Sequence, residues 1–260
     1  MNRVEKAFQN GCAFIPFVMA GDPDLETTRQ LVLAMAKAGA DLIELGIPFS
    51  DPVAEGPVIQ KADERALAAA TTTDKIFDMT AKIRKDSDVP LAFMTYANPV
   101  FVYGAQRFMK KCGECGIDAI IVPDLPFEEK GELLPYCEKY NVALISLIAP
   151  TSKERIGMIA KEAQGFVYCV SSLGVTGVRS EISNDIAQMV SLVKAAKDIP
   201  CAVGFGISTP DQAKAVAACA DGVIVGSAIV RRVGEYGQDA RLVQEVGSFV
   251  RSIKAAMQPA

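Results

Sequence analysis

The chain has 260 residues, a net charge of −4 at pH 7 and an apolar share of 50%, so it can bury a substantial core. Because no basic stripe accompanies this acidic balance, we expect binding neither to nucleic acid nor to an anionic membrane. The N-terminal run MNRVEKAFQNG lacks the apolar core of a signal peptide, and no apolar stretch reaches membrane-spanning length, so a cytoplasmic protein is expected.

Short apolar runs alternate with longer amphipathic stretches along the chain. The short runs are rich in Val, Ile, Leu and Phe and mostly lack alternation, which is typical of parallel strands buried on both faces. We predict strands at 13–19, 41–46, 91–96, 119–122, 143–148, 166–170, 201–203 and 222–225. Helical patterns lie between them, and examples are those at 26–40, 74–87, 128–141, 152–165, 184–198 and 210–220.

Local signals mark the ends of several of these helices. The run STPD at 208–211 offers a hydroxyl cap followed by proline in the first turn, and Gly39, Gly116 and Gly165 lie where helices should stop. Eight strands and at least eight helices in alternation predict a (β/α)8 TIM barrel, with a doubly wound open sheet as the alternative. No break in composition divides the chain, so residues 1–260 are predicted to form a single domain.

The chain contains no histidine and seven cysteines. Histidine is the commonest general base and metal ligand, so acid–base chemistry must rest on carboxylates, Tyr, Lys or Cys. An odd number of scattered cysteines indicates reduced thiols. Cys112 and Cys115 form a C-x-x-C that follows a helical run instead of opening one, so we interpret it as structural and not as a redox or metal site.

Three glycine-bearing turns follow the last three predicted strands, GVTG at 174–177, GFGIS at 204–208 and GS at 226–227. Glycine lets backbone N–H groups approach an anion, and Ser227 would open a helix whose N-terminus favours negative charge. Because loops after the seventh and eighth strands form the usual phosphate site of such barrels, the turns predict a phosphorylated ligand.

The available residues narrow the chemistry at the predicted barrel mouth. The predicted strands contain no lysine for a Schiff base, and metal-dependent aldolases and epimerases usually need histidine ligands. The first strand ends without the ionisable group that a sugar-phosphate isomerase would use. What remains is Glu44 near the end of the second strand, followed by Asp51 and Glu55 in the next loop. A buried acid paired to Lys or Arg is the alternative role for Glu44, and the other two could be ordinary loop acids.

The segment ELGIPFSDPVAEGPVIQ, residues 44–60, closely resembles the signature of the tryptophan synthase alpha chain family. Runs at 17–23, 96–99, 122–126, 174–177, 204–208 and 226–230 resemble the family in order and spacing, across almost the whole chain. The resemblance implies a carbon–carbon lyase of tryptophan biosynthesis, which cleaves indole-3-glycerol phosphate to indole and glyceraldehyde 3-phosphate. Protonation at C3 of the indole gives an indolenine that accepts the bonding electrons, so neither a lysine imine nor a metal is needed.

The resemblance also implies roles for single residues. Glu44 matches the glutamate that handles protons at C3 and at the glycerol hydroxyl. Glu55 matches the acid that draws on the indole N–H, where the family most often has the shorter aspartate, and near-attack geometry is sensitive to such a difference. The remaining matches are Phe17, Tyr96 and Tyr168 at or near the indole site, Thr176 in a closing loop, and Gly177, Gly206, Gly226 and Ser227 at the phosphate. The three aromatic residues could also be ordinary core residues.

For cofactors and partners, the resemblance implies no metal and no cofactor in this chain, with pyridoxal phosphate expected only in a beta chain. An alpha2beta2 assembly with that beta chain is the expected state, and the prolines after Glu44, Asn98-Pro99 and residues 124–127 match the contact side. Three alternatives stay open. They are a stand-alone lyase, another phosphate-barrel enzyme such as a sugar-phosphate isomerase, and a weak subunit kept to activate a beta chain.

Overall fold

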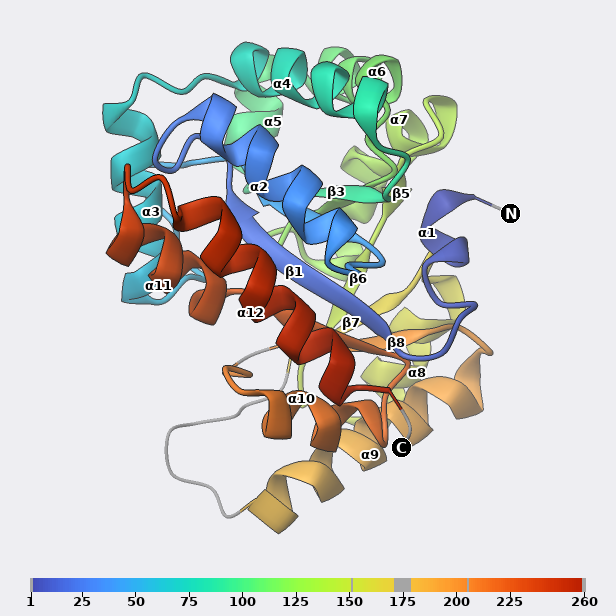
Figure 1. Cartoon of the computed structure of the whole chain (residues 1–260). Helices are drawn as coiled ribbons and strands as arrows, with labels where there is room; N and C mark the ends of the chain where they lie inside the picture. Colours follow the sequence, from blue (N-terminus) through green and yellow to red (C-terminus); the bar gives the residue numbers. More distant parts are fainter. Residues whose placement is uncertain (1, 151, 171–178, 205, 259–260) are drawn as a thin grey trace.

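The computed structural model describes residues 2–150, 152–170, 179–204 and 206–258, and for 179–185 it describes the backbone alone. Strands and helices alternate along it (Figure 1). The strands are β1 (Ala13–Met19), β2 (Ile43–Gly46), β3 (Leu91–Met94), β4 (Ala119–Ile121), β5 (Ala143–Leu144), β6 (Ser146–Ile148), β7 (Val167–Val170), β8 (Cys201–Gly204) and β9 (Gly222–Val225). The helices are α1 (Arg3–Lys6), α2 (Leu25–Lys37), α3 (Pro57–Ala68), α4 (Thr73–Asp86), α5 (Ala97–Tyr103), α6 (Ala105–Cys115), the 3-10 helix η1 (Phe127–Glu132), α7 (Leu134–Lys139), α8 (Lys153–Glu162), α9 (Arg179–Ala196), α10 (Pro210–Ala217), α11 (Ser227–Tyr236) and α12 (Leu242–Ala256).

The strands form a closed parallel barrel with the order β5-β4-β3-β2-β1-β9-β8-β7-β6. The first and last strands of this order, β5 and β6, are consecutive in the chain and separated only by Ile145. The Ile145 N–H still donates to the carbonyl of Ile120, at 2.9 Å, while β6 pairs with β7. The sheet therefore closes through residues 143–148, which confirms the predicted (β/α)8 barrel, with its fifth strand split in two.

Side chains alternate along the strands between the barrel interior and the layer under the helices. In β1, Ala13 and Ile15 belong to the interior cluster, whereas Phe14 and Val18 pack against the helices. The side chain of Val4, from α1, joins the interior cluster and so helps to close the N-terminal end of the barrel. The opposite end, where the strands finish, is left for the loops that carry function in barrels of this kind.

Three aspartates at the N-terminal end of the barrel make the same set of contacts. Each precedes a strand, accepts a backbone N–H of the neighbouring strand, and pairs with a cation from the helix layer. Asp118 Oδ2 accepts from Leu91 N at 2.9 Å and from Arg84 Nη2 at 2.7 Å. Asp41 does so with Phe14 N and Lys254, and Asp221 with Cys201 N and Lys194. These contacts set the strand register at the end away from the predicted site.

Predicted helix ends agree with the structure where local chemistry determines them. Thr209 caps α10 and forms a reciprocal capping box with Gln212, with proline at the first helical position. Gly39, Gly116 and Gly165 have positive φ angles of 102°, 81° and 66°, which residues with a Cβ rarely adopt. Gly39 and Gly116 therefore follow the ends of α2 and α6 as predicted, whereas α8 ends at Glu162, three residues before Gly165.

Other predicted boundaries were wrong. The segment predicted as strand 41–46 begins at Ile43 because Asp41 serves as the register aspartate described above. The one predicted as 91–96 ends at Met94, and Tyr96 instead occupies the position before the first residue of α5. The predicted helix at 128–141 divides into η1 and α7, with Pro135 in the first turn of α7. The predicted strand at 119–122 is shorter by one residue.

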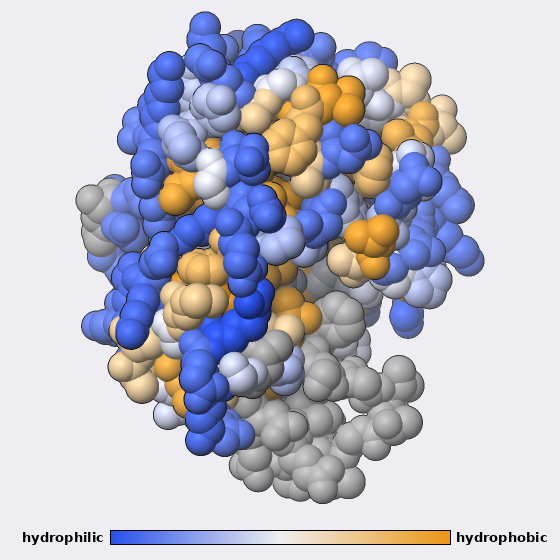
Figure 2. All heavy atoms as spheres, turned by 180° about the vertical axis from the view of Figure 1, so that it is seen from behind, coloured by the Kyte–Doolittle hydropathy of each residue, from blue (hydrophilic) through white to orange (hydrophobic). Residues whose placement is uncertain are grey.

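The surface seen from behind is mostly hydrophilic, with separate apolar patches between the charged side chains (Figure 2). The large apolar residues that remain exposed include Val53, Leu67, Phe101, Val102 and Met158. Among the described residues, none of the helices combines the length and apolarity that crossing a bilayer demands.

Candidate functional site

Glu44 projects from β2 into the barrel interior. Its strand neighbours Ile43 and Leu45 belong to the core under the helices, so the alternation of side chains turns Glu44 inward. It is 1% exposed, and its register partners are Phe17 on β1 and Ala92 on β3. A carboxyl group is therefore held at the second of the four residues of β2, in an apolar interior, and not at the C-terminal end of the strand where it was predicted.

The environment of Glu44 favours the neutral acid. Its Oε1 is buried and accepts no hydrogen bond from any residue that the structure describes. Burial raises the pKa of this carboxyl to about 8, because the low dielectric penalises the charged form. In the described part of the chain, Glu44 forms no ion pair with a lysine or arginine, so the alternative role of a paired structural acid is not supported.

Tyr168 lies close to this acid. It is a buried residue of the interior cluster on β7, and burial together with the nearby Glu44 carboxylate raises the pKa of its phenol. Its hydroxyl lies 2.5 Å from the position that a Cβ on Gly204 would occupy, so the glycine at the end of β8 makes room for the ring. Tyr168 therefore lies in the buried interior of the barrel, beside Glu44.

Phe17 connects the acid side of the mouth with the turn after β9. A Cβ on Gly46, at the end of β2, would approach its ring to 2.7 Å, and a Cβ on Gly226 would lie 3.6 Å from its Cβ. Phe17 is 4% exposed and packs with Met19, Ile59 and residues of α3 and α11 in a separate small cluster. An aromatic ring therefore separates the two polar parts of the candidate site.

The loop between β2 and α3, residues 47–56, folds back over the ends of β2 and β3. The N–H of Phe49 donates to Asp63 Oδ1 on α3 at 3.0 Å, and the N–H of Ala54 donates to the Tyr96 hydroxyl at 3.0 Å. The rings of Phe49 and Tyr96 lie 5.5 Å apart. Tyr96 is thus a support of the acid-bearing loop as well as an aromatic residue of the mouth.

Glu55, at the end of this loop, meets a second acid. Its side chain contacts the carboxyl group of Asp63 and the hydroxyl of Tyr96. Burial, and then the contact with Asp63, raises the pKa of Glu55 well above its usual range. Burial also raises the pKa of Asp63. The interpretation of Glu55 as an ordinary solvated loop acid therefore does not fit, whereas Asp51 is exposed.

The turns after β8 and β9 lie side by side because these strands are paired. Gly206 is exposed with φ of 75°, and Gly226 precedes α11 without a side-chain cap. Ser227 opens α11, so the first N–H groups of this helix are available to an anion. Thr176 and Gly177, the other two predicted residues of this region, lie outside the described residues.

Sequence reasoning missed Asp63, which the fold brings against Glu55. It also missed Arg65, which holds the loop after β1 by two hydrogen bonds to Asp22, at 2.8 and 2.7 Å. Asp63 follows Glu55 by eight residues, but α3 was not among the predicted helices and no motif indicated that its first turns face the loop. A helical reading of 57–68 would have placed Asp63 on the same face as Ile59 and Ala62, which is the buried face.

The cysteine interpretation is consistent with the structure. Cys112 and Cys115 are buried on α6, and burial raises the pKa of both thiols, the opposite of a reactive thiolate. Within the described ranges, no cluster of three His, Cys, Asp or Glu residues could hold a metal ion.

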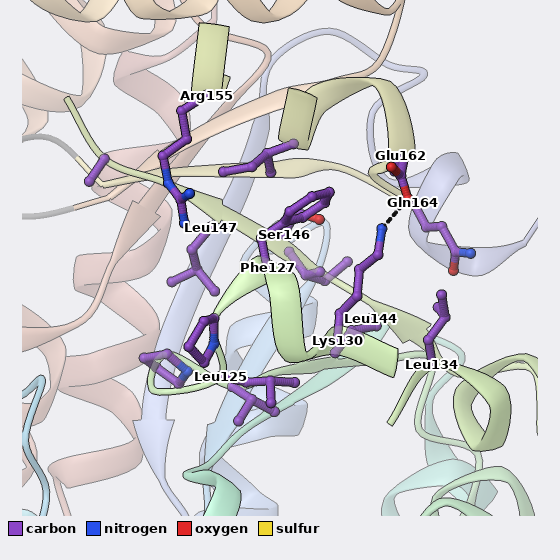
Figure 3. Close-up of a pocket in the computed structure, with 16 residues that line it drawn as sticks. Leu125, Phe127, Lys130, Leu134, Leu144, Ser146, Leu147, Arg155, Glu162 and Gln164 are labelled. Atoms are coloured by element: carbon purple, nitrogen blue, oxygen red, sulfur yellow. Dashed lines mark hydrogen bonds and ion pairs between the residues drawn. The ribbon is translucent and has the colours of Figure 1, made fainter. Parts of the chain in front are cut away.

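A separate cavity of about 250 Å³ lies outside the barrel, between η1, α7 and α8 (Figure 3). Phe127, Leu147 and Arg155 line it, and Lys130 pairs with Glu162 at its edge. The short η1 and α7 replace one longer helix here, so the outer face of the split fifth strand is only partly covered. None of the predicted site residues lines this cavity.

Comparisons with known proteins agree on one family. The sequence model described as tryptophan synthase alpha chain matches residues 4–258. The alpha chain of Thermoanaerobacter sp. (strain X514) is 47% identical over 262 residues, which cover 99% of this chain and 100% of that protein. The alpha chain of Lacticaseibacillus casei is 48% identical, with 99% and 96% covered.

Solved structures give the same result. The tryptophan synthase alpha chain of Legionella pneumophila subsp. pneumophila superposes with a TM-score of 0.89 at 37% identity, covering 99% of this chain and 97% of that one. A chain of the tryptophan synthase a2b2 complex from Pyrococcus furiosus superposes with a TM-score of 0.86 at 34% identity, covering 94% and 98%.

Proposed function

This chain belongs to the tryptophan synthase alpha chain family and is an indole-3-glycerol-phosphate lyase of tryptophan biosynthesis. On that basis we propose roles in the cleavage for individual residues. The observation that carries the proposal is Glu44, a buried carboxyl group that projects into the barrel and has a pKa of about 8. Such an acid still holds its proton at neutral pH and can give it to a bound substrate.

In the proposed mechanism Glu44 acts twice. As a neutral acid it donates its proton to C3 of the indole ring, which becomes an indolenine. As the resulting carboxylate it accepts the proton of the glycerol hydroxyl. The carbon–carbon bond then breaks, its electrons pass into the indolenine, and glyceraldehyde 3-phosphate and indole are released. The apolar interior supports this cycle, because it keeps the pKa of the group near neutrality.

Glu55 is proposed as the group that draws on the indole N–H. Its loop is held to Tyr96 and to α3, which fixes the loop without using the Glu55 carboxyl for capping. Phe17, Tyr96 and Tyr168 are proposed to contact the indole and its surroundings, and Thr176 to close the site. Tyr168 lies beside Glu44, which supports its assignment to the ring-binding wall.

The phosphate of the substrate is proposed to bind at Gly206, Gly226 and Ser227, together with Gly177. The adjacent turns after β8 and β9 and the uncapped start of α11 support this role. Phe17 lies between Gly46 and Gly226, so an elongated substrate could extend past its ring from the acid to the phosphate turns.

The partner is a tryptophan synthase beta chain, which supplies the pyridoxal phosphate chemistry that consumes indole. The similar chain from Pyrococcus furiosus occurs in an a2b2 complex. In this chain Val53 is 79% and Val102 is 80% exposed, on the loop after β2 and on α5. A groove of about 320 Å³ lies between these elements and is lined by Leu67, Asn98 and Pro99 among others. Exposed apolar side chains beside a groove are typical of an interaction surface.

We further propose that residues 1–260 act as one domain and that the enzyme works in the cytoplasm. The family model matches nearly the whole chain, which supports the first proposal. The sugar-phosphate isomerase alternative is not favoured, because β1 presents no ionisable side chain among its seven residues.

The test is indole release from indole-3-glycerol phosphate by the purified chain and by Glu44→Gln. We expect the amide to lower turnover by about a hundredfold or more, because it can neither donate nor accept the proton. Binding of a substrate analogue should remain, because the phosphate turns are unchanged. Turnover within twofold of the parent would mean that Glu44 is not the catalytic acid.

A further inference from the structure

Two carboxyl groups meet beside the acid-bearing loop. Asp63 is 3% exposed, and its Oδ2 has no hydrogen-bond partner among the described residues. Glu55 Oε2 is likewise buried and lacks a partner that could donate to it. The two side chains nevertheless contact each other. Two carboxylate oxygens only accept hydrogen bonds, so a stable contact between them needs a proton.

The groups around this pair offer no positive charge in place of a proton. Arg65 follows Asp63 by two residues, but both of its hydrogen bonds go to Asp22. Within the described residues, no lysine or arginine forms an ion pair with Glu55 or Asp63. The other charged groups that face the pair are the acids Asp22 and Glu64, whose charges raise the pKa of Asp63.

Neutral groups complete the surroundings. The Tyr96 hydroxyl contacts Glu55, and the N–H of Phe49 donates to Asp63 Oδ1 at 3.0 Å. Asp124 faces Tyr96, where burial first and then charges that include that of Asp124 raise the pKa of the hydroxyl. The Phe49 N–H stabilises a negative charge on Asp63, so the proton of the pair belongs mainly to Glu55.

We propose that Asp63 is a positioning residue that shares one proton with Glu55 and holds Glu55 as a neutral acid, which must lose this proton before it can serve the indole N–H. This inference rests on the proposed role of Glu55. Its chemical basis is independent of substrate, because like charges in contact cannot both be ionised at neutral pH. A longer acid at position 55 and an acid at position 63 then form one functional unit.

The consequence for the reaction is a pH dependence on its acidic side. A neutral Glu55 already carries the proton that it would have to accept from the indole nitrogen. Ionised Glu55 is required, whereas Glu44 must be protonated to donate to C3. The two requirements together limit the lyase to a narrow pH range, and Asp63 sets the lower edge of that range.

A direct test measures the titration of Glu55 without any turnover. Side-chain 13C NMR of glutamate-labelled full-length protein is recorded across pH in a Glu44→Gln background, which removes the other raised glutamate. We expect one glutamate carboxyl to titrate well above the usual value of about 4.3 and to vanish on Glu55→Gln. Adding Asp63→Asn should lower its midpoint by about one pH unit or more, since the like charge is gone.

The choice of asparagine at position 63 and a control substitution at position 64 isolate the effect of the Asp63 charge. Asn at position 63 retains an oxygen for the Phe49 N–H, so the loop support is preserved. Glu64→Gln removes an equal charge from the exposed neighbouring position, where solvent screens it, and should shift the midpoint much less than Asp63→Asn does. An ordinary midpoint for Glu55 in the background protein, or an equal midpoint with and without Asp63→Asn, would overturn the shared proton.

The pH profile of kcat separates positioning from structure. Asp63→Asn should move the acidic limb to lower pH by about one unit or more, while Glu64→Gln, at an exposed position, should move it much less. A purely structural role would lower kcat at all pH values alike, and that result would overturn the positioning role. If Glu55→Gln is fully active but the NMR titration behaves as expected, the proton pair stands and the proposed function of Glu55 fails.

Discussion

Glu44 carries a cost to stability that grows with pH. In the folded protein its pKa is about 8, whereas an unfolded glutamate has a value of about 4.3. Below the lower value both states hold the proton and there is no penalty. Between the two values only the folded state is protonated, so rising pH favours unfolding, and above the higher value the penalty is constant.

We therefore expect Glu44→Gln to be more stable than the parent at alkaline pH. The difference in unfolding free energy should increase by about 1.4 kcal/mol per pH unit from about pH 5 to pH 8. Urea unfolding of both proteins at several pH values measures it. Glu55 and Asp63 titrate in both proteins and cancel in the difference. A difference that does not change with pH would contradict the raised pKa of Glu44.

Substitutions of Glu55 distinguish a catalytic role from that of an ordinary loop acid. If it serves the indole N–H, Glu55→Gln should lower kcat by about a hundredfold or more, because a neutral amide cannot take the proton. Glu55→Asp should remain active, since it restores the residue that the family more often has. Asp51→Asn, in the same loop but exposed, is the matched control and should behave like the parent. Parent-like turnover of the Gln variant would remove Glu55 from the mechanism.

At the scale of elements, the turns after β8 and β9 form the proposed phosphate anchor. Gly206 has a φ of 75°, so any side chain there adds backbone strain. Gly206→Ala measures this strain alone, and Gly206→Asp adds a negative charge where the phosphate would bind. We expect KM to rise at least tenfold more for Asp than for Ala, in steady-state assays of indole release. Equal kinetics of the two variants would argue against an anion at this turn.

The N-terminal end of the barrel should affect stability and not catalysis. Asp118 accepts a strand N–H and pairs with Arg84, and both side chains are 11% exposed. Asp118→Asn should cost about 1.5–3 kcal/mol in urea unfolding, because the charged partner of a largely buried guanidinium is lost. The kcat should be unchanged, since the site lies at the opposite end. Asp88→Asn, with a 95% exposed side chain, is the control and should have little effect.

For the whole molecule, docking of a beta chain is expected to raise the lyase rate. Val53 lies exposed on the loop after β2, which carries Glu55, and Val102 lies exposed on α5, which begins directly after Tyr96. A partner seated there would order the loop and exclude water from the acids. Titration of the chain with a matching beta chain, followed by indole release, measures the activation.

A surface variant makes this titration specific. Val102→Glu puts a charge on a residue that is 80% exposed and has no proposed catalytic role, so activity of the lone chain should not change. The activation should then need at least tenfold more beta chain. Full activity of the chain alone, with no complex formed, would instead favour the stand-alone lyase.

The sequence by itself determined the barrel, and it predicted the residues that are proposed for its site. Its apolar runs have the length and composition of parallel strands, and helix ends at Thr209 and Gly116 follow from local chemistry that needs no tertiary contact. Glu44 could be found because a carboxyl group in a strand pattern is costly unless it has a function. Only the tertiary structure decided that the fifth strand splits at Ile145, because barrel closure, not local propensity, determines which neighbour each half pairs with. The tertiary structure alone brought Asp63 from α3 against Glu55. The raised pKa values of these two acids depend on burial and on distances between groups, which the linear order of residues does not contain.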